Sequence, residues 1–415
     1  MRKQLLSIGA ILCSMAIFIV GNGLVGLLIP ARAHLAGFSD FAIGLIGSAY
    51  FLGFVSGCFV GPQLLTRTGH IRLFAIGAGL AAATTLVQSM AMTELVWLVM
   101  RALFGFAAAN IYMVIESWLN DRATNEIRGR IFSAYLIVNF SSLILGQMLY
   151  GTARAEGAAL FSLCAIAYAL CLIPVCMTRL PQPASARVPM LRPLRLYRMA
   201  PVGVIGCVAV GLANGAIWTL APVYALNHGL AKGWLSLFMS VFTLGGALIQ
   251  FPLGRFSDRM DRRLIIVMVC AASALLGLAL AMSGGASRLQ LFALIALFGL
   301  SALPFYGLTV AHTNDRIGRE DFVEASATLL MVSSLASVIG PPLAAIVMGV
   351  WGTSALFFYT AFIHTGMALF TLHRLRIKDA PAAKHHDRFE PAPEQASPAL
   401  ATLDPRNPES DQVAA

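Results

Sequence analysis

The stretch RALFGFAAANIYMVIESWLNDR, residues 101–122, returns further along the chain as IALFGLSALPFYGLTVAHTNDR, residues 295–316. Nine of the 22 positions are identical at a constant offset of 194, namely residues 102–105, Ala108, Tyr112 and residues 120–122 of the first copy. Apolar composition alone would give far fewer identities. The chain therefore contains an internal repeat, and its first position changes from Arg101 to Ile295.

The composition around this repeat is that of a membrane protein. Of the 415 residues, 58% are hydrophobic and only 12% are charged, and the mean hydropathy is +0.78. Soluble domains carry roughly 25% charged residues. A chain so poor in charge is expected to lie in a lipid bilayer.

Twelve apolar runs are long enough to cross a bilayer, which takes about 20 helical residues. Because lipid offers no partner to backbone polar groups, each run is predicted to be a helix, and the fold class is an all-α membrane protein. The runs lie near residues 5–29, 41–62, 73–92, 95–119, 131–151, 158–178, 200–224, 234–253, 264–283, 289–310, 326–350 and 354–372.

The repeat relates runs that are six apart. The fourth run matches the tenth, and Asn22 and Pro30 of the first run correspond to Asn214 and Pro222 of the seventh. Copies six spans apart share one orientation, so the sequence predicts two six-helix bundles related by a parallel pseudo-twofold repeat. The predicted domains are bundles at 1–178 and 200–376, a basic cytoplasmic linker at 179–199, and a disordered cytoplasmic tail at 377–415 that lacks apolar periodicity.

Basic residues set the expected orientation. With the N-terminus in the cytoplasm, 24 of the 29 Lys and Arg residues fall in cytoplasmic segments, four fall in outside loops, and Arg101 lies within a span. This bias predicts that both termini are cytoplasmic. The net charge of +10 then needs no nucleic-acid partner. The first run is also longer than the roughly 7–15 residues of a signal-peptide core, so we expect an uncleaved first helix.

Catalytic and metal-binding signatures are not found in the sequence. All seven cysteines fall inside apolar runs and none forms a CxxC pair, so neither a disulfide framework nor a metal site is predicted. No P-loop, HExxH or GxSxG motif is present. We expect no enzyme activity and no cofactor.

Three motifs resemble those of the major facilitator superfamily. The loop GRFSDRMDRR, residues 254–263, is similar to the family signature Gly-x-x-x-Asp-Arg/Lys-x-Gly-Arg/Lys-Arg/Lys, with Asp261 at its second glycine. The first-half loop GPQLLTRTGHIR, residues 61–72, is a weaker copy with Thr66 at the aspartate. The fourth span carries the embedded arginine of the family. Together, residues 250–263 and 314–326 resemble a bacterial YcaD-like branch.

This resemblance implies a secondary active transporter in the bacterial cytoplasmic (inner) membrane. Such a protein moves a small-molecule substrate by alternating access, here with expected coupling to the proton gradient, and it acts as a monomer. A second interpretation stays open, because a non-transporting receptor or scaffold could use the same fold. Flux in proteoliposomes under an imposed pH gradient separates the two.

Polar residues at membrane depth are the candidates for a central cavity, since burying them in lipid is unfavourable. They are the repeat-related Asn22 and Asn214, Trp218 one turn further on, Arg101, Tyr112 three turns along the same face, and its repeat partner Tyr306. Asn139 and Gln147 are weaker candidates. The asparagines could instead join helices. Arg101 could bind an anionic group, modulate a proton site, or donate to neighbouring helix carbonyls.

A second group is predicted to gate the cytoplasmic side. The resemblance implies that Asp258 docks near the start of the eleventh span, where Asp321 and Glu324 have capping-box-like spacing. Glu116 lies about 22 Å along the fourth helix from Arg101, so we expect it to pair with Arg128 or Arg130, with proton carriage as the alternative. The candidate gate residues are Gly61, Arg67, Glu116, Arg128, Arg130, Gly254, Asp258, Arg259, Arg262, Asp321 and Glu324.

Overall fold

The structure, a computed structural model, describes residues 2–124, 126–177, 183, 191–231, 233–377 and 389–406, without the side chains of residues 2–6 and 319. Within these ranges the chain forms helices joined by short loops and no strand. Twelve helical segments are long and apolar enough to cross a membrane. The predicted all-α, twelve-span fold is confirmed.

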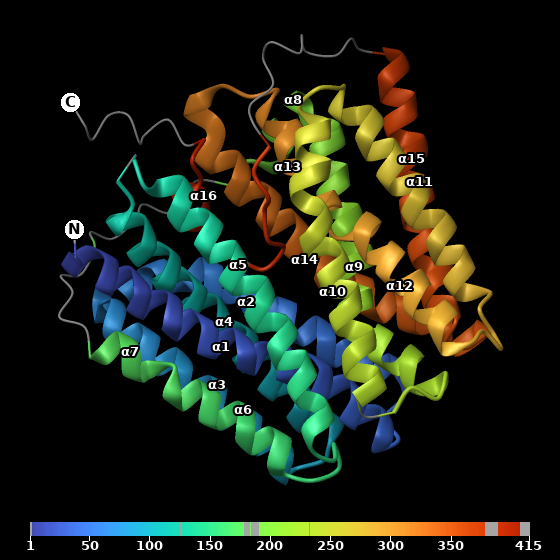
Figure 1. The fold of residues 1–415 in the computed structure, drawn as a ribbon, viewed down its shortest axis with the longest axis horizontal. Helices are drawn as coiled ribbons and strands as arrows, with labels where there is room; N and C mark the ends of the chain where they lie inside the picture. The colour runs from blue at the N-terminus through green and yellow to red at the C-terminus, as the bar shows by residue number, and fades with distance from the viewer. Residues whose placement is uncertain are drawn as a thin grey trace.

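The spans form two groups of six, which lie side by side in Figure 1. The first group is α1 (Arg2–Leu35), α2 (Asp40–Thr68), α3 (His70–Met90), α4 (Glu94–Arg122), α5 (Arg128–Leu149) with η1 (Tyr150–Thr152), and α6 (Ala159–Leu170) with α7 (Leu172–Cys176). The second group is α9 (Pro201–Asn227), α10 (Gly233–Ser257), α11 (Arg262–Ala281), α12 (Arg288–Ala302) with α13 (Phe305–Asn314), α14 (Phe322–Trp351) and α15 (Ala355–Ile377). Short helical segments are α8 (Pro193–Met199), η2 (Arg319–Asp321) and α16 (Leu400–Leu403).

Capping residues define several helix ends. The Ser39 hydroxyl accepts a hydrogen bond from the Ala42 amide at the start of α2. Ser287 and Gln290 form a capping box at the start of α12. Gly69, with a positive φ of 80°, turns the chain between α2 and α3. These local signals satisfy backbone groups that would otherwise be unpaired at the helix ends.

The sequence repeat corresponds to a repeated helix contact. A Cβ on Gly105 of α4 would collide with the carbonyl oxygen of Tyr50 on α2. A Cβ on Gly299 of α12 would collide in the same way with the carbonyl oxygen of Phe242 on α10. Tyr50 and Phe242 are themselves 192 residues apart, in the register of the repeat. Small residues thus let the same pair of helices approach closely in each half.

The tenth span, predicted as one continuous run at 289–310, is interrupted within the membrane. Helix α12 ends at Ala302 and α13 begins at Phe305. The break coincides with Pro304, which has no backbone N–H to continue the hydrogen-bond ladder; Leu303 and Pro304 themselves keep helical angles. The side-chain amide of Asn214 donates to the Ala302 carbonyl at this break, over 3.4 Å. Broken helices at membrane depth are a feature of transporter binding sites.

The two ends of the bundle differ in how the halves meet. One end of the bundle holds the α2–α3 turn, the α10–α11 loop and the C-terminus of α15; we call it the basic end. We call the other end the opposite end. In the half of the bundle nearer the opposite end, the two halves of the chain touch directly. Gly44 of α2 lies against the Pro341 carbonyl of α14, and the Gln147 amide of α5 donates to Thr243 of α10 over 3.1 Å.

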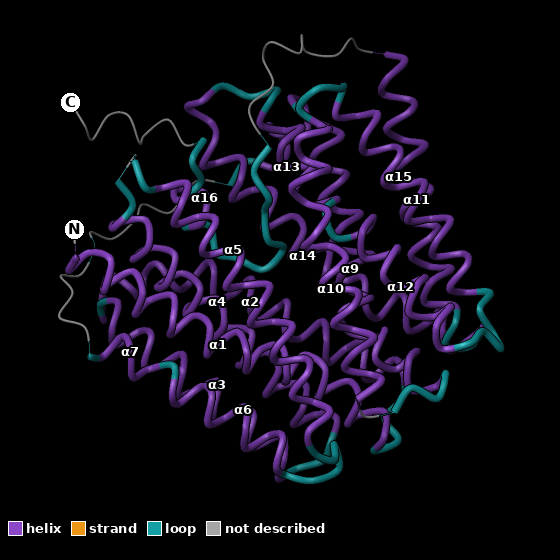
Figure 2. The backbone as a smooth tube through the Cα atoms, in the orientation of Figure 1, coloured by secondary structure: helices purple, strands orange, loops and turns teal. Residues whose placement is uncertain are grey.

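Toward the basic end, a segment of the C-terminal tail lies between the halves. Composition predicted disorder over residues 377–415, whereas the structure gives residues 389–406, here called the tail segment, a defined course (Figures 1 and 2). Its Phe389 amide donates to Asp258 of the second half, and its Ser397 amide donates to Glu116 of the first half. These partners are remote in sequence, so composition alone cannot reveal them.

Candidate functional site

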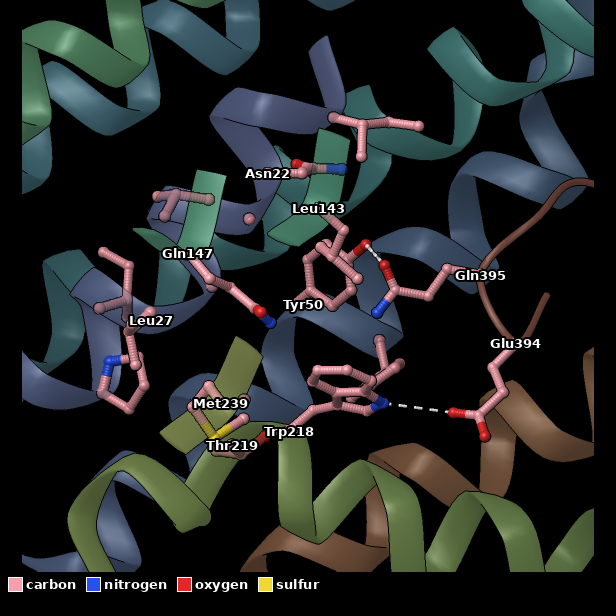
Figure 3. Close-up of a pocket in the computed structure, with 18 of the residues that line it drawn as sticks. Asn22, Leu27, Tyr50, Leu143, Gln147, Trp218, Thr219, Met239, Glu394 and Gln395 are labelled. Carbon is pink, nitrogen blue, oxygen red and sulfur yellow. Dashed lines mark hydrogen bonds between the residues drawn. The ribbon is translucent and has the colours of Figure 1, made fainter. Parts of the chain in front are cut away.

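A central cavity of about 140 Å³ lies between the two halves. Four of the six predicted cavity residues line it: Asn22, Arg101, Tyr112 and Trp218. The weaker candidates Asn139 and Gln147 line it too, and so do tail residues 392–395. Figure 3 shows side chains from the two halves and the tail pointing toward one another around this space.

Arg101 contributes a buried cation to the cavity wall. Its side chain is 8% exposed, and the guanidinium carbon lies 4.8 Å from the centre of the Tyr50 ring and 5.0 Å from that of Phe104. Its Nε and Nη1 atoms have no hydrogen-bond partner among the described residues. Aromatic faces stabilise the charge only in part. An unpaired guanidinium, which stays charged in proteins, is therefore available to an anion.

The second half has lost this arrangement at both positions together. In the repeat register, Ile295 replaces Arg101 and Phe242 replaces Tyr50. Ile295 is fully buried, and Phe242 stacks on Phe298 with ring centres 6.1 Å apart. The same helix–helix contact therefore contains the apolar side chains Ile295 and Phe242 in the second half, and the cation of Arg101 with the phenol of Tyr50 in the first half.

Asn214 and Trp218 form the polar part of the second half. Both donate to Glu394 of the tail segment, Asn214 through its side-chain amide to Oε1 and Trp218 through Nε1 to Oε2 over 3.3 Å. Figure 3 shows Trp218 directed at this carboxyl. Burial raises the pKa of the Glu394 carboxyl to about 7, against the lowering effect of these two hydrogen bonds. The pair therefore offers two neutral donors to one carboxyl group.

The two repeat-related tyrosines take different places. Tyr112 lines the central cavity and its hydroxyl lies beside Asn22. Tyr306 does not line this cavity. It lines a smaller one nearby, bounded by Phe132 of α5 and by Ala392 and other residues of the tail segment. Tyr112 therefore lines the same cavity as Arg101, as their spacing on the fourth helix predicts, whereas Tyr306 does not line that cavity.

Glu116 does not pair with Arg128 or Arg130, so that prediction is wrong. Glu116 is fully buried and accepts from the Tyr135 hydroxyl over 2.7 Å and from Ser397 of the tail segment. Arg128 donates to Asn120 and to the Thr402 carbonyl.

Depth along the antiparallel helices explains the difference. Glu116 lies six residues before the end of α4, about 9 Å into the bundle. Tyr135 lies seven residues after the start of α5, about 10 Å in, whereas Arg128 begins that helix. A tyrosine two turns further in therefore reaches Glu116, and the arginine at the helix start does not.

Arg262 joins two carboxylates in the signature loop. It is 1% exposed, lies 2.7 Å from Asp315 at the end of the tenth span and lies 3.0 Å from Asp258. Asp258 also accepts the Phe389 amide over 2.9 Å. Asp261, at the position of the family's second glycine, caps α11. Burial acts to raise its pKa, but hydrogen bonds from Arg263 outweigh this and lower it.

The start of α14 has other partners than predicted. Asp321 makes no side-chain capping bond and instead pairs with Arg195 of α8 over 2.9 Å. Glu324 lies 3.6 Å from Arg192, just before α8. The capping-box prediction is wrong because a basic residue of the linker helix α8 takes the Asp321 carboxylate. Asp258 is bound elsewhere, by Arg262 of α11 and by the Phe389 amide of the tail segment.

The remaining gate candidates fall into two classes. The glycines make close contacts: a Cβ on Gly61 would lie 2.6 Å from Asn110 Oδ1, and one on Gly254 would overlap the Phe389 ring. Arg67, Arg130 and Arg259 are exposed at the basic end. The structure thus brings Gly254, Asp258 and Arg262 together, and does not join them to Arg67 or Arg130.

Sequence reasoning missed three residues of the site. Tyr50 donates through its hydroxyl to Gln395 over 3.2 Å, and Glu394 is the carboxyl held by Asn214 and Trp218. The Tyr50–Phe242 difference in the repeat register is a signal that could have found Tyr50. Among the described residues, no group of His, Cys, Asp and Glu side chains could hold a metal ion.

The amino-acid sequence is similar to known transporters. The Major Facilitator Superfamily matches residues 10–289 and 203–407. An "Uncharacterized MFS-type transporter YcaD" of Escherichia fergusonii is 27% identical over 385 residues, which cover 92% of this chain and 97% of that protein. Its counterpart from Salmonella typhimurium is 25% identical, covering 85% and 91%.

Solved structures show the same fold at low sequence identity. The nucleoside transporter NupG superposes with a TM-score of 0.75 at 14% identity, covering 91% of this chain and all of that one. A D-xylose-proton symporter gives a TM-score of 0.65 at 14% identity, covering 92% and 98%. At such identities the likeness concerns the fold alone.

Proposed function

The chain belongs to the major facilitator superfamily of secondary transporters, and from that premise we propose that it moves a small solute across the membrane by alternating access. The solute binds in the central cavity between residues 1–178 and 200–376. Asn22, Arg101, Tyr112, Asn214 and Trp218 contact it, with Tyr306 at the border. Arg101 binds an anionic group of the solute.

One observation carries this proposal. The cavity lies between halves that touch each other on the opposite side of the midplane, through α2 with α14 and α5 with α10. Toward the basic end they are separated by a segment that is not a span. With the tail segment withdrawn, the cavity would open toward the basic end alone, and access from one side at a time is what alternating access requires of each of its end states.

We place the basic end in the cytoplasm of a bacterium, with the protein in the inner membrane and both termini inside. The support is the distribution of basic residues, which favour the cytoplasmic side. The chain contains a complete cavity between its own halves, which supports a monomer as the functional unit. Residues 179–199 serve as the linker; most of that stretch lies outside the described residues.

The signature loop is proposed to act as the cytoplasmic gate. Arg262 already joins α11 to the tenth span through Asp315 and holds Asp258. When the cytoplasmic side closes, Asp258 exchanges its tail partner for the start of α14, where Asp321 and Glu324 now bind linker arginines. Arg67, Arg128, Arg130 and Arg259 supply charges at the same end.

Transport is proposed to be coupled to the proton gradient. Glu116 is a fully buried acid on a span, held by Tyr135 and by the tail segment. It is first a gate residue, because its partners lie at the basic end. Proton carriage by Glu116 is the alternative role.

Reconstitution tests the proposal. Purified protein in proteoliposomes, given a panel of small solutes under an imposed pH gradient, should accumulate or expel at least one of them above protein-free vesicles. A collapse of the gradient by a protonophore should remove the effect. If no solute of the panel is transported but one of them binds, the receptor or scaffold interpretation is supported instead.

A further inference from the structure

The tail segment touches both halves along the inner part of the cavity. Glu394 binds Asn214 and Trp218 of the second half, and Gln395 binds Tyr50 of the first. Ser397 binds Glu116. Each contact employs a residue that lines the cavity or gates its basic end, so the tail occupies the place of a ligand (Figure 3).

The outer end of the segment fits the signature loop. The Phe389 ring occupies the space that a Cβ atom on residue 254 would need, which is free because this residue is glycine. The same ring also packs against Gly307 of α13. The Phe389 amide donates to both oxygens of Asp258, over 2.9 and 3.2 Å. A side chain at position 254 would displace this ring. The glycine and the aspartate of the loop are therefore both engaged by the tail.

The space left beside the tail is small. Sites for small ligands hold roughly 300–1,000 Å³, whereas about 140 Å³ remains in this cavity. Residues 392–395 form part of the wall. Withdrawal of the tail segment would enlarge the cavity and open it to the basic end.

Two features of the cavity favour a carboxylate. The Glu394 carboxyl already lies on two N–H donors of the second half. In the first half, Arg101 lines the same cavity, and its Nε and Nη1 atoms have no hydrogen-bond partner among the described residues. The Glu394 carboxyl of the tail therefore takes one anion position and makes no hydrogen bond to Arg101.

We propose that Asn214 and Trp218 form a subsite for a carboxylate group of the solute, and that Glu394 of the tail segment occupies this subsite and blocks the cavity until a solute displaces it. The proposal rests on the proposed transport function and names the solute class and a regulation of the same site. A free carboxylate that also reached Arg101 would gain a charge-assisted bond that the tail does not make. This difference lets the solute compete with a segment tethered at high local concentration.

A cysteine in the tail reports its position in the full-length protein. Ala396 is 2% exposed, so Ala396→Cys, in a background with the seven native cysteines replaced, should react slowly with a membrane-impermeant maleimide in inside-out vesicles. Glu394→Ala should accelerate the reaction about tenfold or more, because two hydrogen bonds to a carboxyl are lost. Glu409→Ala, which removes an acid of the tail outside the described residues, should leave the rate unchanged.

Propionate, the glutamate side chain as a free acid, tests the ligand class. Added to the Ala396→Cys protein, it should accelerate labelling, and the neutral isostere propionamide should not. Arg101→Ala should abolish the effect of propionate, because the bond that lets a free carboxylate displace the tail is the one to this guanidinium.

Two results would overturn the inference. Labelling of Ala396→Cys as fast as in the detergent-denatured protein would show that the tail is not seated. Equal effects of propionate and propionamide would exclude a carboxylate subsite. Neither readout depends on flux, so failure of transport in proteoliposomes with a protected cysteine would reject the proposed function and leave the tail contact intact.

Discussion

At the scale of single residues, Arg101 is the most informative position. Arg101 lines the cavity, its guanidinium packs against the Tyr50 and Phe104 rings, and its Nε and Nη1 atoms have no hydrogen-bond partner among the described residues. Burying such a charge costs at least about 2.5–3.5 kcal/mol at membrane depth. The repeat partner Ile295 shows that packing does not need the cation.

Substitution of Arg101 should therefore impair transport and not insertion. Arg101→Ala should reduce flux to below about a tenth of wild type, because a charged hydrogen-bond donor to the solute is lost. Arg101→Lys keeps the charge and loses the planar fork, so we expect severe impairment as well. Membrane levels by immunoblot serve as the control. Near-normal flux of the alanine variant would contradict a role in binding, and normal flux of the lysine variant alone would leave only the point charge as the requirement.

Glu116 separates gating from proton carriage. Glu116→Gln keeps the side-chain size but cannot exchange a proton. Its amide oxygen can still accept from the Ser397 amide and hydroxyl, while its amide nitrogen would donate to the Tyr135 hydroxyl oxygen in place of the carboxylate that accepts from it. If Glu116 acts in the gate, the glutamine variant should retain solute uptake driven by the proton gradient within about threefold, as expected for a hydrogen bond weakened from charged to neutral. Loss of gradient-driven uptake with intact counterflow exchange would assign proton carriage to Glu116.

At the scale of elements, the close approach of α4 to α2 depends on a glycine. The Tyr50 carbonyl leaves no room for a Cβ at position 105, while Gly79 of α3 has nothing within 4 Å of such an atom. Gly105→Ala should destabilise the protein by roughly 1–3 kcal/mol, as other overpacked sites do. Gly79→Ala should not. Thermal unfolding in detergent measures both, and equal melting temperatures would refute the contact.

The two loop copies should differ in importance. Asp258 binds Arg262 and the tail segment. Thr66, at the corresponding place in the first half, is exposed and donates to the Gln63 carbonyl, three residues earlier in the same helix. Asp258→Asn should strongly lower flux at near wild-type membrane levels, and Thr66→Ala should matter little. A rise in flux for Asp258→Asn would mean that the aspartate only holds the tail and does not close the gate. Equal losses at both positions would show that the asymmetry has been misread.

Elements also show where sequence reasoning stops. The twelve spans could be predicted because a bilayer imposes length and apolarity on each run separately, and the repeat could be read because the glycine contacts of α4 and α12 recur. The Glu116 partner could not be predicted, because helix depth rather than sequence distance decides which side chain reaches it. The tail segment has no periodicity of its own and takes its order from partners about 130 to 350 residues away.

At the scale of the whole molecule, the two halves share the same close helix contacts but contribute different polar groups to the site. The first half supplies Arg101 and Tyr50, and the second supplies Asn214 and Trp218. The second-half loop keeps the aspartate of the family signature, and there Arg262 forms ion pairs with both Asp258 and Asp315. A solute between the halves would therefore meet a cation on one side and neutral donors on the other.

Access to the cavity from both membrane faces is the most direct test of transport by alternating access. Leu143 lines the cavity, and Leu145, two residues on, is 55% exposed on the outer surface of the bundle. A membrane-impermeant maleimide should label Leu143→Cys in a cysteine-free background both in whole cells and in inside-out vesicles, because each half-cycle exposes the cavity to one face. Leu145→Cys should stay unlabelled from either side. If Leu143→Cys is labelled from one face only, with every solute and pH gradient applied, alternating access is contradicted. The interpretation as a non-transporting scaffold then remains.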